Sequence, residues 1–307
     1  TSATPVSVTA NSTVGGTSTG QITLGNTTLA TGTTLTVGVG AATPITLGTV
    51  NGSAGTPNLT INTTSTVSVG AVGSTIGTVT VTQSGGTTFS STVNAATIAL
   101  TDSKVSTAVT FSGNVTATTA LTVAAGTAAY NVIFNGSSNT IAGATTFNNT
   151  GTVTLGNGGD TTAFTGGVVA TAPSSINLNG TVTAAGTGVI TLGDANTGIS
   201  VGGNSTVGGT STGQITLGAA TLADGVTLTV GAGAATPITL STITGTAGST
   251  VSNLTINTTG AVSVGAVGTD IGTVTITQSG GTTFSSTVDA ATITLSNSTA
   301  AANITFS

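Results

Sequence analysis

A long internal duplication is the feature that most limits what this chain can fold into. The run NSTVGGTSTGQITLG begins at Asn11 and again at Asn204, and the run NLTINTT begins at Asn58 and again at Asn253. Residues 1–112 therefore match residues 194–307, and residues 113–193 are the unmatched remainder of the first copy. Such a duplication predicts a repeat architecture, and we expect one continuous repeat segment over residues 1–307. Because the sequence stops partway through the second copy, we expect the natural protein to continue.

A shorter period lies inside the duplication and is marked by phenylalanine. Phe89, Phe111 and Phe134 are 22 and 23 residues apart, and Phe284 and Phe306 are again 22 apart. Their surroundings are alike, as in TTFSSTV and VTFSGNV. We predict that these five side chains stack as a structural ladder, one ring in each coil of a repeat of about 22 residues.

Threonine alternates with apolar residues in many short runs, among them QITLG, TLTVG, NLTIN and TVTVTQ. Alternation of β-branched and apolar residues is typical of strands with one face inside and one outside. Glycine, asparagine and serine separate the runs, and no stretch has apolar residues at helical spacing. The sequence therefore predicts an all-β fold.

Two all-β architectures fit many short strands. Tandem Ig-like β-sandwiches would place two domains in each copy of the duplication. A parallel β-helix, or β-solenoid, would stack coils of two or three strands. We favour the β-helix because the apolar side chains are small, because there is no tryptophan for a sandwich core, and because only 2% of the residues are charged. Like charges destabilise stacked identical positions.

The charge content excludes several classes of function. The chain has one Lys or Arg and six Asp or Glu among 307 residues, and no His or Cys. Phosphate binding needs clustered Lys and Arg, so we expect no nucleic acid partner. Transition-metal sites need His or Cys ligands, which are missing. Glycine and threonine interrupt every hydrophobic stretch, so we expect no transmembrane segment.

The aspartates give little support for a catalytic site. Asp270 and Asp289 are close enough in sequence to lie on neighbouring coils, where a polysaccharide-degrading enzyme would need a pair of acids. Their counterparts in the first copy, however, are Thr75 and Asn94. The GNGGD run at residues 156–160 reads as a turn. We predict no enzyme, no catalytic, cofactor-binding or metal site, and no cofactor. Several Asn-x-Ser/Thr triplets, as at Asn58, leave glycosylation open.

The runs TVTQSGGTTFSSTV, FSGNVTATTALTVAAG and NGTVTAAGTGVITLG resemble bacterial β-strand-repeat surface proteins of the autotransporter-passenger and filamentous-haemagglutinin-like kind. The resemblance implies an extracellular, cell-surface β-solenoid. From it we expect a structural building block of a filament, sheath or surface layer that self-associates. The alternative is a rigid stalk of a large adhesin, with a glycan or surface receptor bound elsewhere. A polysaccharide-degrading β-helix enzyme is the remote alternative.

Overall fold

The structure is a computed structural model that describes residues 4–299 and 302–307. These residues form strands and connecting turns, and none of them is helical. Among them there is accordingly no helix long and apolar enough to cross a membrane. The chain divides into two compact units, Thr1–Thr152 and Val153–Ser307, and each is described by itself.

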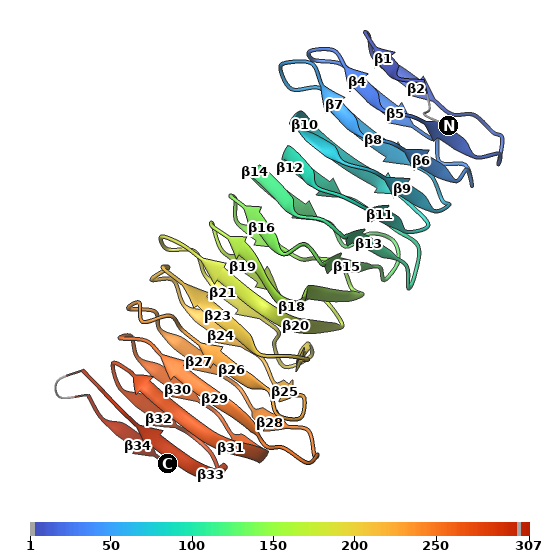
Figure 1. Ribbon diagram of the computed structural model, residues 1–307. Helices are drawn as coiled ribbons and strands as arrows, with labels where there is room; N and C mark the ends of the chain where they lie inside the picture. Colours follow the sequence, from blue (N-terminus) through green and yellow to red (C-terminus); the bar gives the residue numbers. More distant parts are fainter. Residues whose placement is uncertain (1–3, 300–301) are drawn as a thin grey trace. The chain divides into compact units, whose positions relative to one another are not determined.

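The first unit (blue to green in Figure 1) is a stack of parallel strands wound into coils with three sides. Strands β4, β5 and β6 form one coil and pair in register with β7, β8 and β9 of the next. The strands are β1 (Val6–Val8), β2 (Ser12–Val14), β3 (Ile22–Leu24), β4 (Thr27–Leu29), β5 (Thr34–Val37), β6 (Ile45–Leu47), β7 (Val50–Gly52), β8 (Asn58–Asn62), β9 (Val67–Val69), β10 (Val72–Gln83), β11 (Thr87–Phe89), β12 (Val93–Leu100), β13 (Ala108–Phe111), β14 (Val115–Val123), β15 (Asn131–Phe134), β16 (Ser138–Ile141) and β17 (Thr145–Thr146).

The second unit (yellow to red in Figure 1) is built in the same way. Strands β25, β26 and β27 pair in register with β28, β29 and β30. Its strands are β18 (Thr152–Phe164), β19 (Val168–Ala170), β20 (Ser175–Ala184), β21 (Ile190–Leu192), β22 (Gly198–Val201), β23 (Ser205–Gly209), β24 (Ile215–Leu217), β25 (Ala220–Leu222), β26 (Thr227–Val230), β27 (Ile238–Leu240), β28 (Ile243–Gly245), β29 (Ser252–Asn257), β30 (Val262–Val264), β31 (Val267–Gln278), β32 (Thr282–Phe284), β33 (Val288–Leu295) and β34 (Ile304–Phe306).

Each unit is therefore a parallel β-solenoid, which confirms the predicted fold class. An Ig-like sandwich needs antiparallel pairs, and every pairing given for the described strands is parallel, so the alternative is wrong. The coil length varies around the predicted value. Paired residues are 19 positions apart at Val81 and Leu100, and 26 apart at Leu228 and Leu254.

The variation in coil length is absorbed where strands bulge and where turns lengthen, so the strands themselves stay in register. Between β10 and β12, Val72 pairs with Val93 and Ile76 with Ala95, so four residues on one strand oppose two on the other. The same shift recurs between β31 and β33. The number of residues per coil therefore varies more than the arrangement of the paired strands does.

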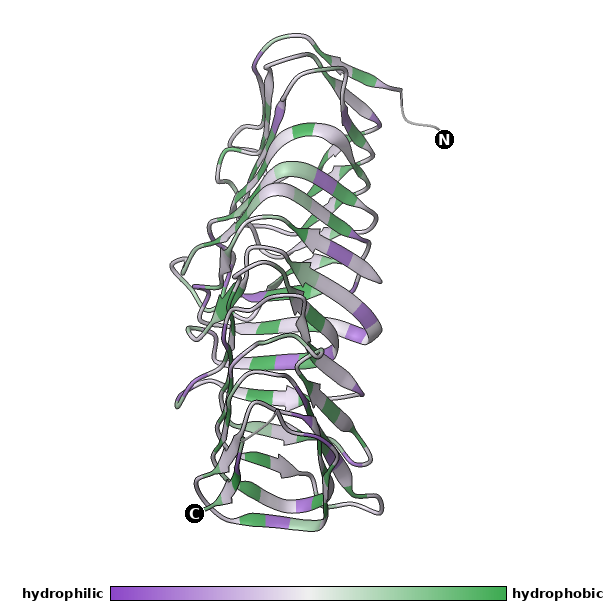
Figure 2. Cartoon of the chain, turned by 90° about the vertical axis from the view of Figure 1, so that its left-hand side faces the viewer, coloured by the Kyte–Doolittle hydropathy of each residue, from purple (hydrophilic) through white to green (hydrophobic). Residues whose placement is uncertain are grey.

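The core of each unit is the narrow interior of the coils. Along strands such as β8 and β26 apolar residues point inward and threonines outward. In Figure 2 hydrophobic segments (green) alternate with paler ones along the strands. In β8 the burial alternates residue by residue, with Leu59 and Ile61 fully buried. Small aliphatic side chains fill this space because a narrow coil has no room for a broad aromatic core.

One corner of the coil is polar although it is buried. In the first unit the hydroxyl of Thr63 donates to the carbonyl oxygen of Thr43 at 2.6 Å, and Thr43 donates to that of Ser18 at 2.6 Å. In the second unit Thr258 donates to Thr236 at 2.6 Å. We call this the corner hydroxyl ladder, and its buried members are Thr43, Thr63, Ser84, Ser103, Ser211, Thr236, Thr258 and Ser279.

Candidate functional site

The predicted phenylalanine ladder is built from rings that pair in register across parallel strands. The rings of Phe89 and Phe111 lie 5.1 Å apart at 7°, and those of Phe111 and Phe134 lie 5.0 Å apart at 20°. In the second unit Phe284 and Phe306 stack at 4.9 Å and 3°. The sequence spacing thus identified core positions. The ladder contributes packing, and its rings contact one another in place of a ligand.

Phe147, which broke the sequence period, extends the same column in another geometry. Its ring lies 6.4 Å from that of Phe134 at 87°, edge to face. Both rings are fully buried. Offset stacked and edge-to-face pairs are both favourable arrangements for aromatic rings.

Asp270 and Asp289 lie on neighbouring strands, as their spacing in the sequence suggested. Val267 pairs with Val288 and Ile271 with Ala290, so each aspartate falls in the bulged stretch between these pairs. Asp270 has a positive φ of 61°, which its short polar side chain tolerates better than most. Both side chains reach solvent, and no basic residue lies on these two strands. The two carboxylates therefore lie in an open setting, with no basic side chain on either strand to assist them.

Three other carboxylates cap backbone N–H groups. Asp102 accepts from the Thr127 amide at 3.1 Å and from its hydroxyl at 2.6 Å. Asp194 accepts from the amides of Asn196 and Thr197 in its own turn. Asp224 accepts from Thr250 at 2.8 Å, one coil further along. These contacts give the carboxylates a structural task in the turns.

The GNGGD run lies within strand β18 of the second unit and not in a turn, so this prediction was wrong. The Asn157 amide donates to Asp160 at 2.8 Å, and Gly158 and Gly159 have φ values of 133° and 74°. Within residues 4–299 and 302–307, no three His, Cys, Asp or Glu side chains gather in a way that could hold a metal ion. Lys104 lies in the turn after β12, and its backbone amide donates to the Ser84 carbonyl.

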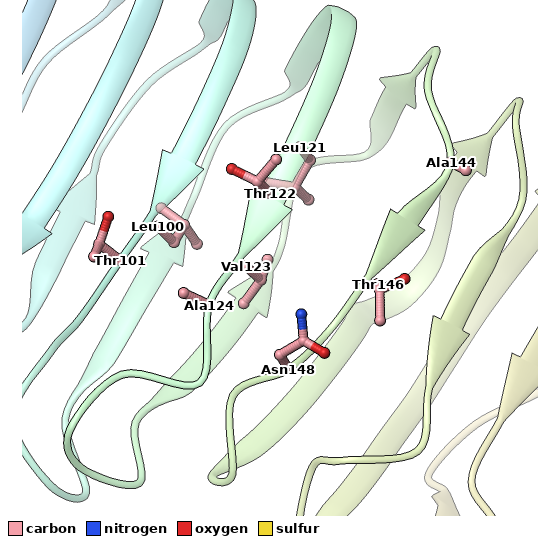
Figure 3. Close-up of a pocket in the computed structure, with 9 residues that line it drawn as sticks. All are labelled: Leu100, Thr101, Leu121, Thr122, Val123, Ala124, Ala144, Thr146 and Asn148. Carbon is pink, nitrogen blue, oxygen red and sulfur yellow. The ribbon is translucent and has the colours of Figure 1, made fainter.

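A groove in the first unit lies where the pairing of β14 is interrupted. Thr116 and Ala117 pair with β16, and the next contact on that edge is the bridge between Val123 and Phe147. Figure 3 shows the part of β14 that carries Leu121, Thr122 and Val123 beside the segment that carries Ala144, Thr146 and Asn148. The groove has a volume of about 400 Å³. Its lining is neutral: Leu100, Thr101, Leu121, Thr122, Val123, Ala124, Ala144, Thr146 and Asn148.

Outward-facing threonines form continuous rows along the stack. In the second unit one residue from each of six paired strands makes a row of threonine alone. The first unit has a matching row with one alanine. We call these the outer threonine rows; they are Thr181, Thr206, Thr229, Thr255, Thr275 and Thr294, and Thr13, Thr36, Thr60, Thr80, Ala99 and Thr122.

In several of the Asn-x-Ser/Thr triplets the asparagine side chain accepts a hydrogen bond from the next coil. The Asn11 side-chain oxygen accepts from the Thr34 amide at 2.8 Å, and Asn58 accepts from Thr78 at 2.9 Å. The second copy repeats the latter bond between Asn253 and Thr273 at 3.0 Å. The side-chain oxygens of these asparagines satisfy backbone donors at the strand starts, which gives them a structural task.

The corner hydroxyl ladder is the feature that the sequence did not reveal. Its members in the first unit, Thr43, Thr63, Ser84 and Ser103, recur at 20, 21 and 19 residues. That recurrence is the available signal, but threonine and serine are so frequent in the chain that it does not stand out. From strand alternation, threonine and serine are expected to face outward. At this corner of the coil their side chains point inward.

Comparison with known proteins gives no match: neither a protein-family model, nor a curated protein, nor a solved structure matches this chain. The resemblance to bacterial surface proteins therefore stays a prediction. The fold and the neutral surfaces described above carry the functional argument.

Proposed function

We propose that this protein is a structural building block of an extracellular bacterial filament, sheath or surface layer, which acts by repeat stacking and self-association. The main support is the surface of the coils. The outer threonine rows run unbroken through six successive strands in the second unit, and none of the charged residues belongs to them.

Neutral rows of this kind favour contact between copies. Surfaces without net charge lack the repulsion that keeps soluble rods apart. Aligned threonines offer one hydroxyl and one methyl group per coil at the strand spacing of about 4.8 Å. A second copy with the same spacing can therefore match such a row over its whole length. Aligned identical side chains pack closely in stacked sheets for the same reason.

The charged residues are consistent with this role. Asp102, Asp194 and Asp224 bond to backbone amides within turns, away from the rows. A binding or catalytic protein concentrates its charged groups where the ligand lies. Here these three charges support the turns, and no charged residue belongs to the outer threonine rows.

The test is association of the purified chain, measured by sedimentation and electron microscopy over a range of concentrations. We expect ordered filaments or lattices, with little dependence on salt because charge plays no part. The triple variant Thr229→Lys, Thr255→Lys and Thr275→Lys places three like charges on one outer row and should weaken lateral contact at least tenfold. Three lysines in turns, at Ser53, Ser106 and Ser249, are the matched control. Chains that stay monomeric at high concentration would rule the proposal out.

Extracellular placement has its own test. An impermeant label or antibody applied to intact cells that carry the natural gene should reach the protein. Signal that appears only after the cells are broken would place it inside and contradict this part of the proposal.

A further inference from the structure

Strand β18 carries a bulge that projects from the stack of the second unit. A Cβ on Gly156 would clash with the Asn179 carbonyl oxygen, and a Cβ on Gly180 would clash with that of Asp160. Gly156 and Asp160 thus face neighbouring residues of β20, and residues 157–159 between them have no counterpart there. Residues 157–159 are exposed, whereas Asp160 is buried. We call residues 156–160 the GNGGD bulge.

The GNGGD bulge contains an Asn-Gly pair with open space around it. A Cβ on Gly158 or on Gly159 would meet nothing within 4 Å. The Asn157 backbone amide donates to the Asp160 carboxylate at 2.8 Å, but the Asn157 side chain makes no hydrogen bond within the part of the chain that the structure describes. Glycine moves between backbone conformations at little cost. The Asn157 side chain can therefore fold back onto the backbone that follows it.

We propose that Asn157 is a site of spontaneous covalent modification, where the side chain cyclises onto the Gly158 nitrogen and becomes aspartate or isoaspartate. This inference is independent of the proposed function. The Gly158 nitrogen gives up its proton and attacks the Asn157 side-chain carbonyl carbon, and the side-chain nitrogen leaves as ammonia. Water then opens the resulting succinimide at either carbonyl. The reaction consumes one water and releases one ammonia, and it needs no oxidant or reductant.

The chain provides its own comparisons, because the Asn-Gly pair occurs four times in the sequence. In two of the other pairs the glycine, Gly136 or Gly180, is buried. The Gly180 amide donates to the Ser205 hydroxyl at 3.1 Å, so the nitrogen that would attack is already engaged. The Gly136 carbonyl accepts from the Asn139 side chain at 2.9 Å. Both pairs are therefore held in place by their surroundings.

The remaining pair, Asn51–Gly52, is part of the strand ladder of the first unit. It lies in β7 and pairs in register with Thr28 and Leu29. The Gly52 carbonyl accepts from the Thr75 hydroxyl at 2.8 Å. Ring closure needs the asparagine backbone to leave the extended conformation, which strand pairing opposes. Of the four pairs, the one in the GNGGD bulge is thus the least restrained.

The modification adds charge to a chain that carries little. The net charge of −5 becomes one unit more negative with each event. The new carboxylate lies near Asp160, and repulsion between like charges weakens the hydrogen bond from the Asn157 backbone amide. Isoaspartate also routes the main chain through the side-chain carbon, and the projecting bulge has room for this change. The paired strands should therefore stay folded.

Incubation of the folded wild-type chain at mildly alkaline pH tests the proposal. Isoelectric focusing should show a more acidic form that grows with time. Mass spectrometry of peptides should place the change at Asn157, at a rate at least tenfold above those at Asn51, Asn135 and Asn179. In urea, where the fold restrains none of the pairs, the four rates should agree within a few fold because the dipeptide is the same.

A variant of the exposed asparagine isolates its contribution. Asn157→Gln lengthens the side chain, which disfavours ring closure, and should remove the early acidic form while leaving the urea midpoint of unfolding unchanged. Asn51→Gln is the matched control and should leave the acidic form in place. Two results would overturn the inference: a folded chain in which Asn157 reacts as slowly as the other three asparagines, or an early acidic form that persists in Asn157→Gln. Neither result bears on self-association.

Discussion

The buried hydroxyl of Thr63 donates a hydrogen bond to the carbonyl oxygen of Thr43, 2.6 Å away and one coil earlier. The same hydroxyl lies 2.9 Å from the Ala41 carbonyl and accepts from the Ser65 amide at 3.1 Å. Its counterpart Thr258 makes the equivalent bonds to Thr236 and Ala234. One side chain therefore satisfies several backbone groups at a corner where no strand pairing exists.

Removing this hydroxyl should destabilise the first unit. Thr63→Val keeps the shape but leaves the buried Thr43 carbonyl without its donor, which costs about 1–3 kcal/mol. The measurement is the urea midpoint of unfolding. Thr60→Val, on the outer threonine row three residues away, is the control and should change the midpoint little. If both variants lowered the unfolding midpoint equally, the corner hydrogen bond would contribute no more to stability than an outward-facing threonine does.

Thr87 presents the opposite case, because its buried hydroxyl has no partner within the described residues. Its counterpart Thr282 is in the same state. Thr87 pairs in register with Val67 on one side and Val109 on the other, so the position suits valine. Thr87→Val should raise the free energy of unfolding by about 1 kcal/mol, since an unbonded buried hydroxyl is costly.

Thr88→Val, one residue on and facing outward, is the matched control for Thr87→Val and should be near neutral. A loss of stability at Thr87 would point to a bound water that bonds the hydroxyl. Thr282→Val in the second copy should reproduce the gain, which makes the duplication an internal repeat of the experiment.

The strands and the phenylalanine ladder were predictable because both depend on short-range pattern. Alternation marks which residues of a strand point inward, and the spacing of Phe89, Phe111 and Phe134 gives the coil length directly. The corner hydroxyl ladder was not predictable in this way. Its residues sit in turns, where alternation ends, and inward-facing threonine looks the same in sequence as outward-facing threonine.

The role of Asp224 was also hidden, for a different reason. Aligning the two copies pairs it with Thr31, so the sequence gives no sign of a task for this carboxylate. The second copy is longer by two residues near Gly248. Asp224 bonds to the amides of Ser249 and Thr250 in that longer turn. Asp224 and the two-residue insertion are about 25 residues apart in sequence but lie next to each other in the stack. Both are present in the second copy, and both are missing from the first.

Gly38 must remain glycine for two independent reasons. Its φ is +86°, and a Cβ there would clash with the Asn62 carbonyl oxygen. A left-handed backbone alone costs a residue with a Cβ about 1–2 kcal/mol. Gly38→Ala should therefore lower the unfolding midpoint markedly, and Gly231→Ala in the second copy should do the same. Gly16→Ala, where a Cβ would meet nothing within 4 Å, is the control and should cost little.

Tyr130 allows a titration that no other side chain obscures, because it is the sole tyrosine. Its hydroxyl donates to the Ala124 carbonyl at 2.7 Å. Burial raises the pKa of this hydroxyl well above its ordinary value of 10.0, and the Asp102 carboxylate adds to the rise. The folded state thus holds the proton more tightly than the unfolded state.

The sign of the pH effect follows from that difference. The contribution of Tyr130 to stability is fully present below pH 10 and is lost as the pH climbs from there toward the raised value. Ultraviolet absorbance should show no tyrosinate at pH 10 in the folded chain and half-ionised tyrosine at that pH in urea. Tyr130→Phe should make stability above pH 10 less dependent on pH. Tyrosinate formed at pH 10 without unfolding would contradict the buried, bonded hydroxyl.

Asp224→Ala should loosen one turn and leave the rest of the stack unchanged. The Ser249 and Thr250 amides lose their acceptor, so their hydrogen exchange should quicken severalfold, whereas the neighbouring β26 amides keep their protection. Asp224→Asn retains one acceptor oxygen and should show an intermediate rate at one of the two amides. Deleting the two extra residues of the turn should remove the effect of Asp224→Ala, because the shorter turn of the first copy holds without a carboxylate. An Asp224→Ala effect that persists after the deletion would separate the charge from the insertion.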